Sequence, residues 1–164
     1  MKSIKKRRKE RKTDYMKRMN LLKSEKPRLV FRKTNKYVIA QYVLSDETLD
    51  KVEFGFSSKE LLKKGFPKEM AGSLKSLPAC YLLGYLIGKK VVKEKKEVPV
   101  MDFGMERNIH GSRIYAFLNG FVDAGVKIKY HEKVLPAKER IEGKHLKKDF
   151  SKTFSEIKSK IDKE

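Results

Sequence analysis

The stretch RLVFRKTNKYVIAQYV, residues 28–43, decides the fold class. Its two runs alternate apolar and polar side chains and are separated by Thr34 and Asn35, which favour a turn, so the stretch predicts a β-hairpin. A second turn at residues 45–47 and the alternation of Val52, Phe54 and Phe56 predict a third strand over residues 49–57. The first part of the chain is therefore expected to form an antiparallel meander.

An apolar helix is expected to cover this meander. Residues 63–76 contain glycine and proline and predict a surface connection, after which Pro78 opens an apolar stretch that runs to about Glu94. The stretch is apolar nearly all round, which predicts burial against the sheet. Gly84 and Gly88 are expected to let this helix approach neighbouring backbone closely, rather than to dimerise in a membrane.

Residues 98–129 predict a strand-helix-strand unit. Residues 98–103 have the composition of a strand, Ser112 is placed to cap a helix that Gly125 ends, and residues 126–129 resume an extended pattern. The fold class expected is α/β: a mixed sheet with helices packed on it, a basic N-terminal extension and a C-terminal helix.

The expected organisation is a basic arm with a short helix over residues 1–26, an α/β domain over 27–142 and a Lys-rich C-terminal helix or tail over 143–164. A stripe of four apolar side chains in the last segment is expected to dock on the same domain or on a partner; it consists of Phe150, Phe154, Ile157 and Ile161.

The charge is large and unevenly distributed. The chain has 41 Lys and Arg against 21 Asp and Glu, a formal net charge of +20, and residues 1–40 alone carry 16 basic and 3 acidic side chains. Such a positive field favours a polyanionic partner. Residues 1–12 hold eight basic residues and predict an arm that is disordered alone and orders on RNA; a solvated tail or a localisation signal is the alternative.

A short helix should follow the arm. Thr13 is placed to cap it, Asp14 lies near its positive end, and it should run to Lys23 with Lys17 and Arg18 pointing outward.

Composition argues against several other classes of protein. The single cysteine, Cys80, cannot form an intramolecular disulfide, and the three histidines lack a partner at metal-ligand spacing, so we expect a reducing, cytoplasmic location and neither zinc nor another cofactor. The N-terminus lacks a signal-peptide core, and the longest apolar stretch is too short to cross a bilayer, so no membrane partner is expected.

Catalysis has little support in the sequence. A metal-dependent nuclease would need converging carboxylates, and the candidates, Asp102 with Asp50, Glu53 and Asp123, show no spacing that brings them together. Asp102 is instead expected to fix the loop 104–111. Phosphate-binding glycine motifs are absent from the sequence, and Cys80 lies in the apolar helix without an adjacent base. We therefore expect a protein that is not an enzyme.

Two regions favour RNA binding. The hairpin combines phosphate-binding cations with an amide and an aromatic ring: Arg28, Arg32, Lys33, Asn35, Lys36 and Tyr37. Alternatively, Tyr37 belongs to the core and the charges only solvate an edge strand. The second region is the loop 104–113, where a helix start and the side chains of Arg107 and Arg113 could bind a phosphate.

The order of these motifs resembles a known family. They are TDY at 13–15, KPRLVFRKTNKY at 26–37, AQ at 40–41, PACYLLG at 78–84, GSRIYA at 111–116, DAG at 123–125, LP at 135–136 and RIEGKH at 140–145. Together they are similar to the universal large-subunit ribosomal protein eighteen, in its archaeal and eukaryotic form, over most of residues 7–146. Leu83 stands where relatives often have Thr, and the tail after His145 is short.

The resemblance implies a structural protein of the cytoplasmic ribosome that binds 5S ribosomal RNA and anchors it in the central protuberance. Its partners would be 5S and large-subunit ribosomal RNA and neighbouring ribosomal proteins; a general RNA chaperone and a metal-dependent nuclease are the alternatives. By motif the resemblance assigns as RNA contacts Arg7, Arg8, Arg11, Tyr15, Arg28, Arg32, Lys33, Asn35, Lys36, Gln41, Ser112 and Arg113. Further candidates, added for their charge or position, are Lys12, Arg18, Thr34, Tyr37, Arg107, Lys144 and His145.

Overall fold

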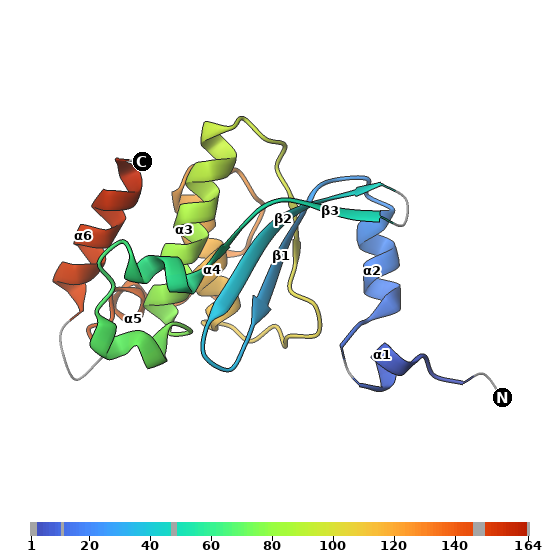
Figure 1. Ribbon diagram of the computed structural model, residues 1–164, viewed down its shortest axis with the longest axis horizontal. Helices are drawn as coiled ribbons and strands as arrows, with labels where there is room; N and C mark the ends of the chain where they lie inside the picture. The colour runs from blue at the N-terminus through green and yellow to red at the C-terminus, as the bar shows by residue number, and fades with distance from the viewer. Residues whose placement is uncertain (1–2, 11, 47–48, 146–149, 164) are drawn as a thin grey trace.

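The fold is described by a computed structural model that covers residues 3–10, 12–46, 49–145 and 150–163. Its centre is a four-stranded sheet in the order β3-β2-β1-β4 (Figure 1). The strands are β1 (Arg28–Lys33), β2 (Val38–Asp46), β3 (Leu49–Ser57) and β4 (Val100–Asp102).

The predicted meander is confirmed. β1 pairs antiparallel with β2, from Arg28 opposite Val43 to Lys33 opposite Val38, and β2 pairs antiparallel with β3. β4 lies parallel to β1, so the sheet is mixed, as predicted. β4 is shorter than the strand predicted over residues 98–103, since only three of its residues pair with β1.

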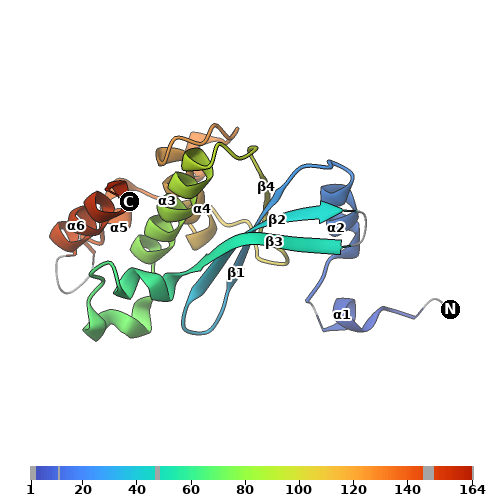
Figure 2. The same cartoon turned by 45° about the horizontal axis from the view of Figure 1, so that its top comes forward.

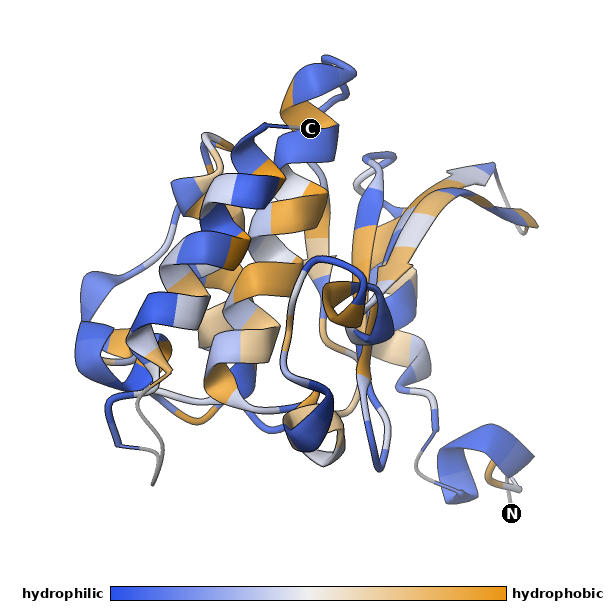
Figure 3. Ribbon diagram, turned by 60° about the vertical axis from the view of Figure 1, so that its left-hand side comes forward, coloured by the Kyte–Doolittle hydropathy of each residue, from blue (hydrophilic) through white to orange (hydrophobic). Residues whose placement is uncertain are grey.

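Two helices cover one face of the sheet, α3 (Leu77–Lys93) and α4 (Arg113–Asp123) (Figures 1 and 2). The alternation of β1 sends Leu29 and Phe31 into this layer, where they are fully buried. Phe31 packs on Phe117 of α4, with ring centroids 4.8 Å apart. Figure 3 shows the apolar residues concentrated on the strands and these helices, whereas the turn beside the N-terminus is hydrophilic.

The contact between α3 and α4 depends on glycine. A Cβ built at Gly84 would lie 2.1 Å from the carbonyl oxygen of Phe117, and one at Gly120 would lie 2.1 Å from that of Tyr81. Only glycine permits so close an approach of two helix backbones. The expected role of Gly84, close packing on neighbouring backbone, is therefore confirmed.

The C-terminal helix, α6 (Ser151–Asp162), docks on its own chain. Its side chains Phe154, Ile157 and Ile161 are buried in a second apolar cluster beside α3. The same cluster includes residues of η1 (Ser58–Leu62), η2 (Lys68–Ser73) and α5 (Lys138–Glu142). The short helix η3 (Glu132–Val134) precedes α5. Of the two docking sites expected for the apolar stripe, the structure shows the one on the same chain.

Two expectations about local structure were wrong. Residues 126–129 form no strand, because Val126 turns into the core and the segment pairs with no other described strand, so the strand-helix-strand unit lacks its second strand. The connection 63–76 is more than a surface loop, since Phe66 and Leu74 are buried in the second cluster.

The arm forms two short helices, α1 (Lys6–Lys9) and α2 (Tyr15–Leu22), instead of one. They lie at the end of the molecule opposite α6 (Figures 1 and 2). Neither helix has a buried residue. In the part of the chain described here, no helix has the length and apolarity that a bilayer span requires.

Candidate nucleic-acid interface

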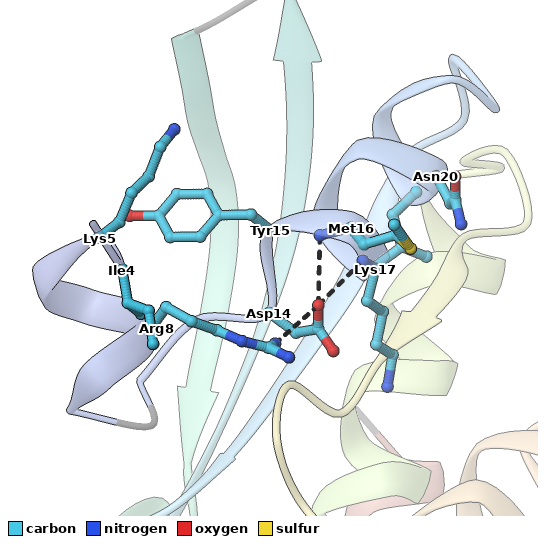
Figure 4. A pocket seen from close by; sticks show the side chains of 9 residues that line it. Ile4, Lys5, Arg8, Asp14, Tyr15, Met16, Lys17 and Asn20 are labelled. Atoms are coloured by element: carbon cyan, nitrogen blue, oxygen red, sulfur yellow. Dashed lines mark hydrogen bonds and ion pairs between the residues drawn. The ribbon is translucent and has the colours of Figure 1, made fainter. Parts of the chain in front are cut away.

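The start of α2 is organised by Asp14, not by Thr13 as predicted. The Asp14 carboxylate accepts hydrogen bonds from the backbone amides of Met16 and Lys17, at 3.2 and 3.4 Å, and pairs with Arg8 at 3.0 Å (Figure 4). The Lys17 amide does most to lower the pKa of Asp14. Thr13 instead contacts α1: its Oγ1 accepts a hydrogen bond from Arg7 Nε at 3.0 Å. These contacts fold α1 back against α2.

Two cationic side chains attach α2 to the domain. Lys17 Nζ donates to the Gly104 carbonyl at 3.1 Å, and Arg18 pairs with Asp50 at 2.7 Å. The prediction that Lys17 and Arg18 point outward was therefore wrong. In contrast, Met16 and Met19 are 77% and 61% exposed, so α2 shows apolar surface to its surroundings.

Arg28 is buried in an ion-pair network. Its side chain is 2% exposed and donates to Asp50 at 2.7 Å and to Asp102 at 3.3 Å. Asp102 also pairs with Arg32 at 3.1 Å and accepts the Gly104 amide at 2.8 Å, so it fixes the start of the loop 104–111. The expected structural role of Asp102 is therefore confirmed.

The pKa of each carboxylate in this network is lowered. Burial acts to raise the pKa of Asp102, but the charges of Arg32 and Arg28 and the Gly104 amide outweigh it and lower that pKa below 3.8. Burial also acts to raise the pKa of Asp50, but hydrogen bonds from Arg18 and Arg28 outweigh it and lower that pKa. The network holds β1, β4 and α2 together while Arg32 remains 44% exposed.

The arm, the hairpin and the start of α4 meet at one hollow of about 730 Å³. Its polar lining is predominantly cationic and comes from three segments that are distant in the sequence: Lys12, Arg32, Lys33, Arg107, Ser112 and Arg113. Glu106 also lines it and pairs with Lys33 at 2.9 Å. A smaller adjoining hollow of about 120 Å³ is also lined by Lys12 and Arg32, together with Arg7 and Arg18.

Ser112 precedes α4 but does not cap it with its side chain, contrary to the prediction. Its Oγ is buried and forms no hydrogen bond with the described residues. The first amides of a helix lack intrahelical acceptors and carry partial positive charge. Together with the exposed Arg113, they make this corner of the hollow suitable for a phosphate oxygen.

The hairpin turn lies apart from the hollow and is shaped by Thr34. The Thr34 hydroxyl donates to the Tyr37 carbonyl at 2.7 Å and accepts the Tyr37 amide at 3.1 Å, which leaves Asn35 and Lys36 exposed. Tyr37 is half-buried against the second apolar cluster, and Lys59 Nζ lies 4.3 Å from its ring centroid. The ring is therefore partly covered, as in the alternative that places Tyr37 in the core.

Gln41 lies on the sheet face that α3 and α4 leave open. It is opposite Val30 on β1 and Gly55 on β3, and it is half-exposed. A Cβ at Gly55 would lie 2.9 Å from Gln41 Cγ, so glycine there leaves room for the Gln41 side chain. The open face thus offers an amide between the cations of β1 and the edge of the sheet.

Some residues predicted to contact RNA lie away from the hollow. Lys144 and His145 follow α5, at the α6 end of the molecule (Figure 1), and Lys144 pairs with Glu142 at 3.0 Å. Tyr15 faces the arm, with Lys5 Nζ 4.6 Å from its ring centroid (Figure 4). Arg11 lies outside the described residues. The RNA-binding role assigned to every candidate residue stays a prediction, and Arg28 is the candidate that the ion-pair network buries.

The contacts of Lys17 and Asp50, which position α2, were not predicted from the sequence. Nothing in their spacing marks them, because their partners are 87 and 32 residues away in the sequence.

The acidic side chains considered for catalysis have other partners. Asp50 and Asp102 meet at Arg28, Asp123 accepts a hydrogen bond from the Tyr81 hydroxyl, and Glu53 pairs with Lys96 at 3.1 Å. The described ranges contain no group of three acidic, histidine or cysteine side chains that could hold a metal ion. Cys80 is buried in the core, which raises the pKa of its thiol to about 12.

Comparison with known proteins places the chain in a family. Residues 1–99 match the family described as ribosomal large subunit proteins 60S L5 and 50S L18. The chain is 44% identical over 141 residues to large ribosomal subunit protein uL18 of Korarchaeum cryptofilum, covering 85% of this chain and 70% of that protein. It is also 44% identical over 141 residues to uL18 of Methanococcus maripaludis, covering 86% and 71%. The resemblance found in the motifs is confirmed, and the chain belongs to the uL18 family of large ribosomal subunit proteins.

Proposed function

We propose that this chain binds 5S ribosomal RNA and helps to anchor it in the central protuberance of the large ribosomal subunit. It would join 5S RNA to large-subunit RNA and to neighbouring ribosomal proteins, as a structural and not a catalytic component. As a member of a ribosomal protein family, it has its place in the ribosome, in the cytoplasm.

The observation that carries the proposal is the cationic hollow. Three regions predicted separately to bind RNA, namely the arm, the hairpin and the start of α4, contribute Lys12, Arg32 and Arg113 to one lining. Phosphate contacts supply a large share of the affinity of nucleic-acid-binding proteins and position the partner. In this proposal Arg28, being buried, holds the strands that present Arg32.

A gel shift with 5S RNA at rising salt tests the arm. Removing residues 1–12 should weaken binding and flatten the dependence of log K on log salt, because fewer counterions are released. The slope should change by about 0.7 to 0.9 for each phosphate that the arm neutralises. Equal slopes for the full chain and the truncated chain would contradict a role of the arm as a phosphate clamp.

Arg113→Ala tests whether the site is specific. The variant should lose affinity and also part of its preference for 5S RNA over an unrelated RNA of equal length. Arg140→Ala is the matched control. It also removes an exposed arginine side chain, but from α5, at the other end of the molecule (Figure 1). A general RNA chaperone predicts similar affinity for both RNAs before and after the Arg113 substitution.

A further inference from the structure

The hollow of about 120 Å³ lies where the arm meets the domain, and we call it the small hollow. Its lining comes from the arm, α2, β1 and the residues around Gly104. Five of its charged residues are cationic and two are acidic: Arg7, Lys12, Lys17, Arg18 and Arg32 against Asp14 and Asp102. The contact between arm and domain is therefore made by groups that mostly carry the same charge.

Ion pairs within the protein do not neutralise this charge. When the ion-pair partners of the lining are added, the described group contains seven cationic side chains and four carboxylates, a net charge of +3: Arg7, Arg8, Lys12, Lys17, Arg18, Arg28 and Arg32 against Glu10, Asp14, Asp50 and Asp102. Arg7 and Lys17 donate to neutral oxygens, those of the Thr13 hydroxyl at 3.0 Å and the Gly104 carbonyl at 3.1 Å. Among the described residues, neither of these two cations pairs with a carboxylate.

Two of the cations meet at Gly104. Lys17 Nζ donates to its carbonyl, and a Cβ built at Gly104 would lie 3.0 Å from Arg32 Cζ, so the guanidinium lies against this residue. Like charges held so close repel each other, and an anion between them removes the repulsion. Arginine and lysine bind phosphate oxygens through charge-assisted hydrogen bonds.

The size of the small hollow limits what can fill it. Its volume of about 120 Å³ is below the range of roughly 300–1,000 Å³ in which proteins hold organic ligands, so it suits a small anion and not a nucleobase.

We infer that the small hollow binds one phosphate group, which holds the arm and α2 on the domain. The inference rests on the proposed function in one respect: a phosphate of the 5S RNA backbone is the expected source, and free inorganic phosphate is the other. A phosphate between Arg7, Lys17 and Arg32 joins segments that are otherwise attached by the exposed Arg18–Asp50 pair and a hydrogen bond to a carbonyl. Chloride only screens that pair, so the two anions should act in opposite directions.

Hydrogen exchange in the full chain tests the inference without RNA. At a constant ionic strength of about 0.15 M, inorganic phosphate in place of chloride should slow exchange in α2, about threefold when its concentration is about twice its Kd. Arg7→Gln should abolish this effect, whereas Arg7→Lys, which keeps the charge, should retain most of it. Lys9→Gln is the matched control, because it removes an exposed cation of α1 that does not line the small hollow.

Two results would overturn the inference. One is equal exchange of α2 in phosphate and in chloride. The other is loss of the phosphate effect in Lys9→Gln as well as in Arg7→Gln, which would mean that general charge and not this site is responsible.

A gel shift with 5S RNA identifies the source of the phosphate. If the RNA backbone supplies it, inorganic phosphate at constant ionic strength should weaken RNA binding by the unaltered chain but not by Arg7→Gln. If free phosphate fills the small hollow, RNA affinity should not fall in phosphate; both results support the site. Absence of 5S RNA binding would count against the proposed function alone, because the exchange experiment contains no RNA.

Discussion

The two terminal helices, α2 and α6, are attached to the domain by different forces. α6 buries Phe154, Ile157 and Ile161 beside α3, whereas α2 buries no residue and is attached by Lys17 and Arg18. Apolar burial is not weakened by electrostatic screening, whereas exposed ion pairs are screened by salt and compete poorly with a phosphate partner. The difference predicts that α6 stays docked at high salt, whereas α2 is released.

Truncating an apolar side chain of α6 should have the largest effect. Ile157→Ala leaves a cavity in the second cluster and should lower the free energy of unfolding by about 2–4 kcal/mol. Met19→Ala in α2 is the matched change and should alter it by less than about 0.5 kcal/mol, because Met19 is already exposed. Urea unfolding followed by circular dichroism measures both. Equal losses of unfolding free energy in the two variants would contradict the view that apolar burial holds α6 but not α2.

Breaking the network at Asp102 should have an intermediate effect. Asp102→Asn leaves the buried Arg28 with Asp50 as its remaining carboxylate partner and should cost about 2 kcal/mol at pH 7. The depressed pKa of Asp102 stabilises the native protein at pH values above 3.8, and this contribution is lost as pH falls below 3.8 through the native pKa. The variant lacks that titration, so its unfolding free energy should fall less steeply in acid than that of the unaltered chain. A parallel fall in both would contradict the network.

Releasing α2 should have the smallest effect on global stability. Arg18→Ala removes a pair whose side chains are 38% and 32% exposed, and it should cost less than about 1 kcal/mol. Hydrogen exchange should nevertheless accelerate in α2 and remain unchanged in α6. Raising salt to about 1 M, where the screening length is about 3 Å, should accelerate exchange in α2 of the unaltered chain in the same way. If neither Arg18→Ala nor high salt altered hydrogen exchange in α2, contacts other than these ion pairs would hold α2 on the domain.

Much of the fold could be predicted because its signals are local. The alternation in residues 28–57 specified three strands and their meander, and the apolar run after Pro78 specified α3. The segment 126–129 misled the prediction, because Val126 is apolar in order to fill the core and not to pair with a strand. Ser112 likewise has the right position and residue type for a cap, yet its hydroxyl does not bond to the helix.

The sequence by itself determined the charge, its concentration in the first 40 residues and the class of partner that such a field attracts. Only the tertiary structure decided which cations are free to meet that partner, because ion pairs form between residues that the topology brings together. Arg28 and Arg32 lie on the same strand and look alike in sequence, yet Arg28 is 2% exposed against two carboxylates while Arg32 is 44% exposed at the hollow. Asp102 pairs with both arginines, so the difference comes from Asp50, which lies 22 residues beyond Arg28 and pairs with it. The spacing of these residues along the chain does not reveal that contact.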